Sequence, residues 1–433
     1  MKIAGRQSNR KLPHWGQVRF QGYPRFQNQI PTAIIGKETI YQSEKMSKLS
    51  RRKFTQFILQ VAGAAGIINL LDKAKSWAAA GQGEQDWIPE KTWVFAVGIL
   101  EWKHPDVWAP FPDAVEGRFD RKLVNFFRSK GVPSNQIVYL EDRGATLREI
   151  TTKLPQLLSN TQQDDLLIFY FAGHGDWDSD SDEHYFINYD ANAEDRDNYW
   201  SISSIFDDIE NNFNGAKVLL LADCCYSGGL IDELKRRKTK LSYACVTSAY
   251  SHNTSTGEWT FTKSLYQSLQ GDPKVDKDSD RIVSLSDFSK YAELEMAFIE
   301  EQKSMFYTTN NFNPQMRLAS VSGQSQPDIG KHVEVKYEGE WYKAKILETN
   351  NSQFKVRYIE GDWEPEWVKP QQTRPYQPKM FAIGAKVKVK DDEEKWYNAT
   401  VKKAWYGLHF ISYDDYSETW DEWVGSDRIK PRN

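Results

Sequence analysis

The sequence predicts an α/β protein with a mostly parallel sheet and helices on both of its faces, followed by two small all-β barrels. Between residues 92 and 300, short apolar runs alternate with segments of helical spacing, which is typical of a parallel sheet covered by helices. After residue 329, a pattern of short alternating strands occurs twice. A repeat of this kind is expected for tandem small barrels.

Five apolar runs are expected to form buried strands, at residues 92–99, 136–140, 166–171, 218–222 and 241–248. Apolar side chains at helical spacing predict helices over residues 118–130, 203–213 and 260–269. Thr146 is expected to cap a further helix that carries Ile150, Leu154 and Leu157. Ser284 and Asp287 form a capping box ahead of a last helix that runs to about residue 300.

Composition and charge exclude several classes of protein. A chain of 433 residues with 39% hydrophobic residues can form two to four folded domains. It has no apolar run long enough for an integral membrane span. Its net charge of −4 gives no general attraction to nucleic acid. Three cysteines cannot form a disulfide framework.

The N-terminal part has the features of an export signal behind a leader. Residues 1–45 carry eight Lys or Arg and two Asp or Glu, and we interpret them as a disordered or misannotated leader, with Met46 as the true start. Residues 46–80 contain paired arginines at 51–52, a weakly apolar stretch and an alanine run at 78–80. They resemble a twin-arginine signal. Export to a periplasm or lumen is therefore expected; the alternative is a cytoplasmic protein with an amphipathic helix here.

Reactive side chains follow two of the predicted strands. The strand at 166–171 leads into Gly173-His174-Gly175, and the strand at 218–222 leads into residues 223–229, which include Cys225. Ligand sites of such sheets lie at the C-terminal ends of the strands. A thiol and an imidazole are the nucleophile and base of a thiol peptidase. Backbone N–H groups of Gly175 and Cys225 would form the oxyanion hole. Cys224 is expected to face the other way, because adjacent strand residues alternate.

Residues 170–175 and 223–228, together with the 51-position offset between His174 and Cys225, resemble the caspase-like peptidases. Within them the similarity is to metacaspases and their bacterial relatives, the orthocaspases, and it covers about residues 90–322. The resemblance implies that His174 is the general base, that Cys225 is the nucleophile, and that no cofactor is needed for the chemistry.

Asp223 indicates protein or peptide substrates with a basic P1 residue. A carboxylate two positions before the nucleophile would pair with Arg or Lys and repel acidic side chains. The family resemblance places this aspartate in the S1 pocket; the alternative is a structural turn cap. The family's second S1 acid is Asp113 or Asp120, and we favour Asp120.

The segment at 176–197 is acidic and could hold an activating calcium ion, as the resemblance to metacaspases implies. The expected ligands are Asp176, Asp178, Asp180 and Asp182; the alternative is a solvated acidic loop. Residues 276–282 look like half of an EF-hand loop, but Arg281 replaces its glycine. We expect no metal there.

A basic cluster follows the nucleophile and is expected to lie in a loop. It comprises Lys235, Arg236, Arg237 and Lys238. An enzyme that prefers basic P1 residues could cleave itself there. The alternative is an exposed, solvated loop.

The two C-terminal repeats, residues 329–376 and 381–433, resemble Tudor-like or agenet domains of the SH3-like barrel type. Ile329-Gly330 recurs as Ile383-Gly384, 54 residues later. Aromatic side chains near carboxylates can bind alkylated ammonium groups or basic peptides; the expected cage residues are Trp341, Tyr358, Trp396 and Tyr413. The alternative is that these rings only fill the barrel cores. We expect a peptide ligand and no nucleic acid.

Two functions remain in competition at this point. The first is an active cysteine endopeptidase whose barrels recruit a target. The second is a catalytically idle scaffold that acts through its Tudor-like repeats. The presence of both His174 and Cys225 favours the first. A metal hydrolase is poorly supported, because no His/Cys cluster has ligand spacing.

Overall fold

The computed structural model describes residues 87–432 apart from residues 112–114, 116, 194, 252–258, 301, 310, 323–327, 351, 360–362 and 392–393. The predicted leader, the predicted signal segment and Asp113 lie outside the described residues. In the described part of the chain, no helix has both the length and the apolar character that a membrane span needs.

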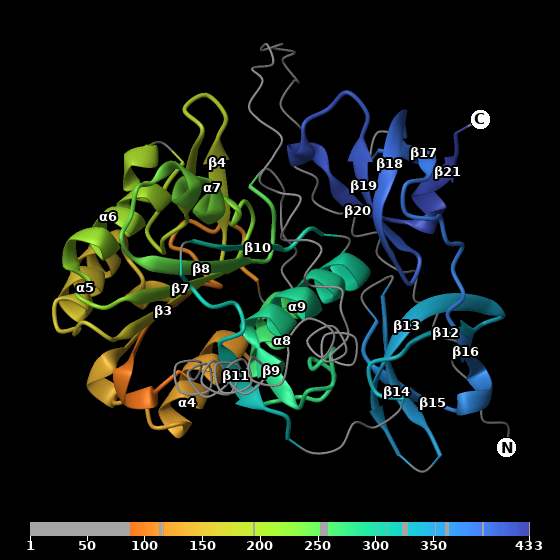
Figure 1. The fold of residues 1–433 in the computed structure, drawn as a ribbon, viewed down its shortest axis with the longest axis horizontal. Helices are drawn as coiled ribbons and strands as arrows, with labels where there is room; N and C mark the ends of the chain where they lie inside the picture. Colours follow the sequence, from red (N-terminus) through yellow and green to blue (C-terminus); the bar gives the residue numbers. More distant parts are fainter. Residues whose placement is uncertain are drawn as a thin grey trace, which may run out of the picture. The chain divides into compact units, whose positions relative to one another are not determined.

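A six-stranded sheet forms the centre of the first domain (Figure 1). Its strand order is β10-β8-β7-β3-β1-β2, with β10 antiparallel and the other five strands parallel. The strands are β1 (Thr92–Gly98), β2 (Ile137–Glu141), β3 (Leu166–Ala172), β7 (Lys217–Asp223), β8 (Ser242–Thr247) and β10 (Met305–Thr308). The predicted fold class is confirmed, and all five expected strands are present.

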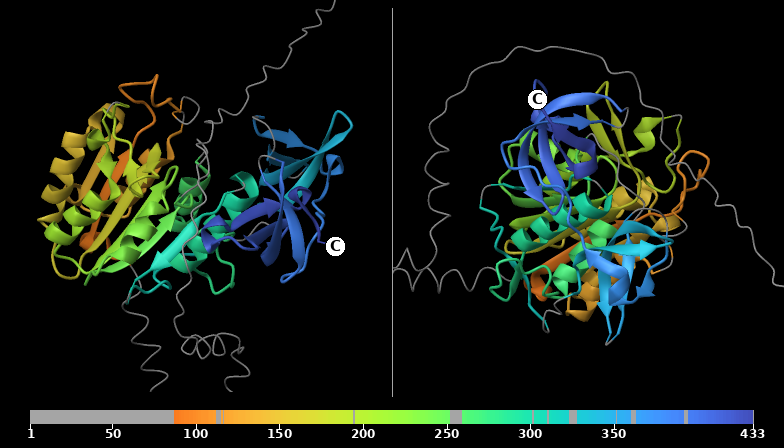
Figure 2. Two further views of the ribbon diagram at one scale, coloured as in Figure 1. Left: turned by 90° about the horizontal axis from the view of Figure 1, so that it is seen from above. Right: turned by 90° about the vertical axis from the view of Figure 1, so that its right-hand side faces the viewer.

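Helices cover both faces of this sheet, as Figure 2 shows. One face packs against α5 (Leu147–Leu158), α6 (Ile202–Asn212) and α7 (Gly229–Arg236). The other packs against α4 (Phe119–Ser129), α8 (Thr260–Leu269) and α9 (Leu285–Glu300). Successive residues of β1 and β3 alternate between the two cores. Every residue of both strands is buried, which explains why they appear as unbroken apolar runs in the sequence.

Several short strands were not predicted. The acidic segment forms a small antiparallel sheet of β4 (Gly175–Asp178), β5 (Glu183–Phe186) and β6 (Trp200–Ser201). A second pair joins β9 (Ile282–Ser284) to β11 (Arg317–Ser320). Aspartate and glycine are depleted in strands, so the sequence of β4 favours a loop. Pairing with β5 overrides this local preference.

Each C-terminal repeat forms a five-stranded antiparallel sheet with the same strand order. The first is β15-β14-β13-β12-β16 and the second is β20-β19-β18-β17-β21. Their strands are β12 (His332–Tyr337), β13 (Glu340–Thr349), β14 (Phe354–Tyr358), β15 (Glu366–Val368), β16 (Thr373–Pro375), β17 (Lys386–Lys390), β18 (Trp396–Trp405), β19 (Leu408–Tyr413), β20 (Glu422–Gly425) and β21 (Ile429–Pro431). We call them barrel 1 and barrel 2.

Candidate active site

The C-terminal ends of β3 and β7 lie side by side. Ala172 is paired with Asp223 in the parallel ladder, and the N–H of Gly173 donates to the carbonyl of Asp223 at 3.4 Å. The segments that carry His174 and Cys225 therefore leave the sheet as neighbours, as expected for parallel strands.

Beyond the sheet, these two segments stay in backbone contact. A methyl group on Gly175 would lie 2.0 Å from the carbonyl oxygen of Cys225 and 3.3 Å from Sγ of Cys224. No side chain larger than hydrogen fits there unless the two segments move apart. Gly175 thus permits the close approach of the predicted base and nucleophile segments.

The imidazole of His174 lies half-buried among aromatic rings. Ring centroids of Trp102, Phe111 and Trp108 lie 4.3, 4.5 and 5.7 Å away. Its Nε2 is 2.8 Å from the carbonyl oxygen of Ala109. A carbonyl can only accept, so Nε2 carries the proton and Nδ1 is the basic nitrogen of the neutral ring. Burial lowers the pKa of His174, and the bond to Ala109 partly opposes this.

The two adjacent cysteines differ in burial. Cys224 is 2% exposed, lies in the core on the α5–α7 face, and donates its N–H to Oγ of Ser248 at 3.1 Å. Burial raises the pKa of its thiol well above the ordinary value. Cys225 is half-buried. The expected reason for this difference was strand alternation, which is wrong, because β7 ends at Asp223 and both cysteines lie in the following turn.

Asp223 is buried and binds the start of α8. Its Oδ2 accepts from the N–H of Thr262 at 3.1 Å and from Oγ1 of Thr262 at 2.6 Å. Burial raises the pKa of Asp223 to about 6, while the bonds from Thr262 and Ser248 lower it. The carboxylate therefore has a structural function, as the alternative interpretation of Asp223 expected, but it binds the N-terminus of α8.

Asp120 is buried beside an arginine of the chain itself. Nη2 of Arg118 lies 2.6 Å from Oδ2 of Asp120 and also donates to the carbonyl of Gly98 at 2.9 Å. The hydroxyl of Tyr139 donates to the same carboxylate oxygen at 2.9 Å. Asp120 thus already pairs with a guanidinium. Burial raises the pKa of Tyr170, and the charges of Asp223 and Asp120 raise it further, so both predicted S1 acids lie near this tyrosine.

The four predicted calcium ligands lie on or beside β4, and arginines pair with three of them. Arg196 is 3.4 Å from Asp176 and 3.0 Å from Asp178. Arg236 binds Asp182 at 2.9 Å, and Asp180 donates its N–H to Asp178. The structure does not gather these four carboxylates around one point. Calcium binding by this segment stays a prediction.

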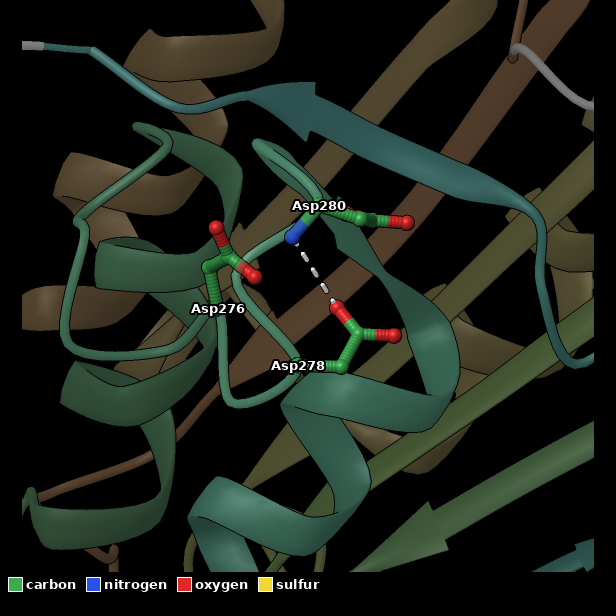
Figure 3. Close-up of side chains that lie close together, drawn as sticks. All are labelled: Asp276, Asp278 and Asp280. Atoms are coloured by element: carbon green, nitrogen blue, oxygen red, sulfur yellow. Dashed lines mark hydrogen bonds between the residues drawn. The ribbon is translucent and has the colours of Figure 1, made fainter. Parts of the chain in front are cut away.

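Within the described ranges, one group of acids does converge, as Figure 3 shows. Ligand oxygens of Asp276, Asp278 and Asp280 all lie within 4.8 Å of one another. The N–H of Asp280 donates to Oδ1 of Asp278 at 3.3 Å, and the N–H groups of Arg281 and Ile282 donate to Asp276 and Asp280. The cluster thus stabilises its own turn, and no ligand needs to be invoked for it.

The basic cluster after the nucleophile is not a loop throughout. Lys235 and Arg236 form the last turn of α7. Arg237 lies close to Glu233 at 2.6 Å, Asp207 at 2.8 Å and Glu210 at 3.2 Å. The expectation of a loop is therefore wrong for the first two residues. Lys238 is exposed beyond the helix.

The predicted aromatic cages do not form as proposed. Trp341 lies 4.1 Å from the guanidinium of Arg374, and Trp396 lies 3.6 Å from Nζ of Lys430. Tyr358 and Tyr413 pack in other clusters. In barrel 1 the cluster is Tyr337, Tyr342, Tyr358 and Trp363; in barrel 2 it is Tyr397, Tyr413 and Tyr416. Adjacent strand residues face opposite sides, so Trp341 and Tyr342 cannot share a cage.

Each cluster also has a carboxylate. The hydroxyl of Tyr358 donates to Glu366 at 2.7 Å, and that of Tyr413 donates to Glu422 at 2.5 Å. Both Tyr–Glu pairs fall at matching positions of the two repeats, because the tyrosine and the Glu-Trp-Val motif occur in each repeat. Trp363 and Tyr416, which complete the two clusters, lie in loops. The alternation of side chains along a strand does not apply in a loop, so it does not predict which way these two rings point.

Comparison with known proteins identifies both kinds of domain. Residues 120–314 match the caspase domain family, and residues 330–378 match the Agenet domain family. The chain therefore carries a caspase domain followed by an Agenet domain. No curated protein matches the chain.

Three solved structures are similar to parts of the chain. The crystal structure of protein GSU0716 from Geobacter sulfurreducens is 14% identical and covers 54% of this chain and 100% of its own, with a TM-score of 0.38. AGDP1 AGD34 from Arabidopsis thaliana is 22% identical and covers 24% of this chain and 82% of its own, with a TM-score of 0.12. ADCP1 tandem Agenet domain 3-4 is 25% identical and covers 24% of this chain and 79% of its own, with a TM-score of 0.11.

Proposed function

We propose that the caspase domain is a cysteine endopeptidase in which Cys225 is the nucleophile and His174 the general base. The observation that carries the proposal is the backbone contact of Gly175 with Cys225 at the ends of adjacent strands. It holds the two chemistry-bearing segments together where α/β sheets bind their ligands.

The chemistry follows from the two side chains. Nδ1 of His174 takes the proton of the Cys225 thiol as the sulfur attacks the carbonyl carbon of the substrate. His174 then gives this proton to the leaving amine as the C–N bond breaks, which leaves a thioester on Cys225. Water attacks the thioester with His174 again as base, and the acid and the free thiol are released.

Ala109 positions the base in this scheme. Its carbonyl holds Nε2–H of His174, so the other ring nitrogen is the acceptor. Burial keeps the imidazole neutral near pH 7 by lowering its pKa. A neutral imidazole is the form that can accept the proton of the thiol.

The N–H of Gly175 is oriented for an oxyanion hole. Gly175 pairs with Phe186 in the antiparallel ladder, and Ile187 donates its N–H to the carbonyl of His174 at 3.0 Å. Since bonded and non-bonded pairs alternate, Gly175–Phe186 is a non-bonded pair, and the N–H of Gly175 points away from β5. It can therefore donate to a developing oxyanion, together with the N–H of Cys225.

For substrate choice we infer a preference for Arg or Lys at P1, with Asp223 as the main acid. Asp223 keeps a carboxylate near the nucleophile segment, whereas Arg118 already neutralises Asp120. A substrate guanidinium could not pair with Asp120 unless Arg118 moved aside. Asp120 is thus better explained as part of the domain's internal ion network.

The barrels are proposed to bind peptides that carry a basic or alkylated ammonium group. In barrel 1, Trp363 and Tyr337 are 37% and 43% exposed, and the ring of Trp363 lies between those of Tyr337 and the buried Tyr358, with centroids 5.1 and 4.8 Å away. Glu366 lies beside them. This arrangement of rings and a carboxylate suits a cation. It replaces the cage of Trp341 and Tyr358 expected from the sequence.

Calcium activation, self-cleavage and export remain proposals. Lys238 is the member of the basic cluster best placed for cleavage, because it is exposed and lies outside α7. Addition of a chelator to the purified protein, and N-terminal sequencing of the protein from cells, would test these three points.

Hydrolysis of fluorogenic peptides by the full chain tests the main proposal. Substrates with Arg, Lys and Asp at P1 would be compared with and without calcium, in the wild type, Cys225→Ala and the matched control Cys245→Ala. We expect cleavage after Arg and Lys that Cys225→Ala abolishes and Cys245→Ala retains. Equal activity in Cys225→Ala would refute the nucleophile. No activity in folded wild type would favour the idle scaffold.

A further inference from the structure

Two adjoining cavities lie between the caspase domain and barrel 1. The larger has a volume of about 910 Å³ and is formed by α4, α8, the turn after α8 and the start of barrel 1. The smaller has a volume of about 200 Å³ and extends to α9 and to Trp405 of barrel 2. Lys274 and Ile329 line both, so the two cavities are neighbours, and we call them together the recess.

Lysines dominate the charge of this recess. Among the described residues that line it, Asp272 and Glu295 are the only acids, against six lysines. Those lysines are Lys122, Lys130, Lys274, Lys277, Lys331 and Lys345. Six positive charges against two negative charges leave an excess of four, or of three once the pairing of Lys331 with Asp328 at 2.8 Å is counted, in a chain whose overall net charge is −4.

Both acids of the recess already form ion pairs with lysines that line it. Lys345 and Glu295 form a buried ion pair, and Lys274 binds Asp272 at 3.1 Å. Lys122, Lys130 and Lys277 have no carboxylate partner among the described residues. Lys122 and Lys130 instead lie over the rings of Phe119 and Phe126.

Four lysines line the inner end of the recess: Lys274, Lys277, Lys331 and Lys345. Burial lowers the pKa of Lys345; the charge of Glu295 partly opposes this, and the positive charge of Lys274 adds to it. Burial, followed by the charges of Arg357, Lys345 and Lys274, lowers the pKa of nearby Lys263 to about 8. These ammonium groups destabilise one another, and a bound anion would remove that repulsion.

The backbone holds the central lysine in place. Gly330 has a φ of +85°, and a methyl group there would lie 2.9 Å from Cδ of Lys274. The entry of barrel 1 therefore packs directly on the stem of Lys274, and its ammonium group is presented where the two cavities meet.

We propose that this recess binds a small ligand with two or more phosphate groups, which would bridge the caspase domain and barrel 1. Lysine is a compact point charge suited to phosphate oxygens. The inner cavity has room for one phosphate among Lys274, Lys277 and Lys345. The larger cavity, with Lys122 and Lys130 beside Phe126 and Tyr266, has room for the rest of the ligand.

Calorimetric titration of the full chain with inorganic tripolyphosphate tests the proposal. We expect saturable binding that weakens with salt, accompanied by a higher melting temperature. Lys274→Met/Lys277→Met should reduce the affinity by about 100-fold or more, since each of the two charged hydrogen bonds that are lost contributes about tenfold or more. The matched control is Lys355→Met, a partly exposed lysine of barrel 1 outside the recess.

Three outcomes would overturn the proposal: no binding by the wild type, equal loss in Lys355→Met, or an undiminished affinity in the double variant. Citrate serves as a polycarboxylate probe, and equally tight citrate binding would overturn the assignment to phosphate. Single Lys277→Met, at an exposed position, provides a second test should the double variant fold poorly. Binding does not depend on Cys225, so failure here leaves the peptidase proposal untouched.

Discussion

At the scale of single residues, Gly175 and Asp223 make contacts at the strand ends that a bulky apolar residue could not make. Gly175 lets two segments touch, and Asp223 joins the end of β7 to the start of α8. Gly175 comes shortly after β3, which is buried throughout, and Asp223 is the last residue of β7, which is buried apart from Lys217. The site thus depends on small and polar residues placed where the apolar pattern stops.

Gly175→Ala should abolish most peptidase activity. The added methyl would meet the carbonyl oxygen of Cys225 and shift an N–H that we assign to the oxyanion hole. Loss of one such donor lowers kcat by roughly 10²- to 10³-fold. The matched control is Gly144→Ala, where nothing lies within 4 Å of the added methyl. Steady-state kinetics on Arg substrates measure the effect; unchanged kcat in Gly175→Ala would contradict the assignment.

The stability of the protein should depend on pH through Asp223. Its pKa is raised from 3.8 to about 6 in the folded state, so the native protein binds this proton more tightly than the unfolded chain. Its contribution to stability is fully present below about pH 4 and is lost as the pH rises through 6. Asp223→Asn should remove this decline, which amounts to about 2–3 kcal/mol.

Urea unfolding of wild type and Asp223→Asn between pH 4 and 7 measures this difference. Asp427→Asn, at an exposed position, is the control and should follow the wild type. Parallel curves for wild type and Asp223→Asn would show that the pKa of Asp223 is not raised.

At the scale of elements, the sequence predicted correctly those helix ends whose hydrogen bonds are made by residues close by in the chain. Thr146 caps α5 by accepting from the N–H of Glu149. Ser284 and Asp287 form the predicted capping box: Asp287 donates its N–H to Ser284, and Ser284 donates its N–H and hydroxyl to Asp287. Strands β4 to β6 were missed, because glycine and aspartate disfavour a strand at β4, which forms by pairing with β5.

Ser284→Ala should destabilise α9 by about 1 kcal/mol, the usual effect of losing an N-cap. Ser286→Ala is the matched control: Ser286 lies two residues further on and bonds through its backbone, its N–H donating to the carbonyl of Pro314 and its carbonyl accepting from the hydroxyl of Ser289. The urea midpoints of the two variants and the wild type provide the measurement. An equal midpoint for Ser284→Ala and Ser286→Ala would count against the cap.

At the scale of the molecule, α9 connects the caspase domain to both barrels. The ring of Phe298 stacks on that of His332 at 3.4 Å, and Phe298 also packs with Leu408 and Trp423 of barrel 2. Glu295 pairs with Lys345 of barrel 1, and both side chains are at least 90% buried. Burial of this kind indicates that the barrels pack against the caspase domain.

Removal of one partner of this buried ion pair should be strongly destabilising. Lys345→Met leaves the Glu295 carboxylate buried without a partner, an effect of about 3–5 kcal/mol. Glu295→Met/Lys345→Met should recover most of this loss, since two apolar side chains can pack together. Lys355→Met breaks an exposed pair and should change stability by less than about 1 kcal/mol. Calorimetric melting distinguishes these cases; a double variant as unstable as Lys345→Met would refute the pairing.

The sequence by itself determined the elements whose information is local. Unbroken apolar runs marked β1, β3 and β7, and the 54-residue repeat marked the barrels. It also placed His174 and Cys225 after neighbouring strands, because parallel strands end at one edge.

Only the tertiary structure decided which side chains meet. Arg118 pairs with Asp120, and the rings that join Tyr358 include Trp363 but exclude Trp341. The lysines of the recess come from segments as far apart as residues 122 and 345. Such contacts are set by how helices and barrels pack in space, and a single sequence records no distance between segments that are remote along the chain.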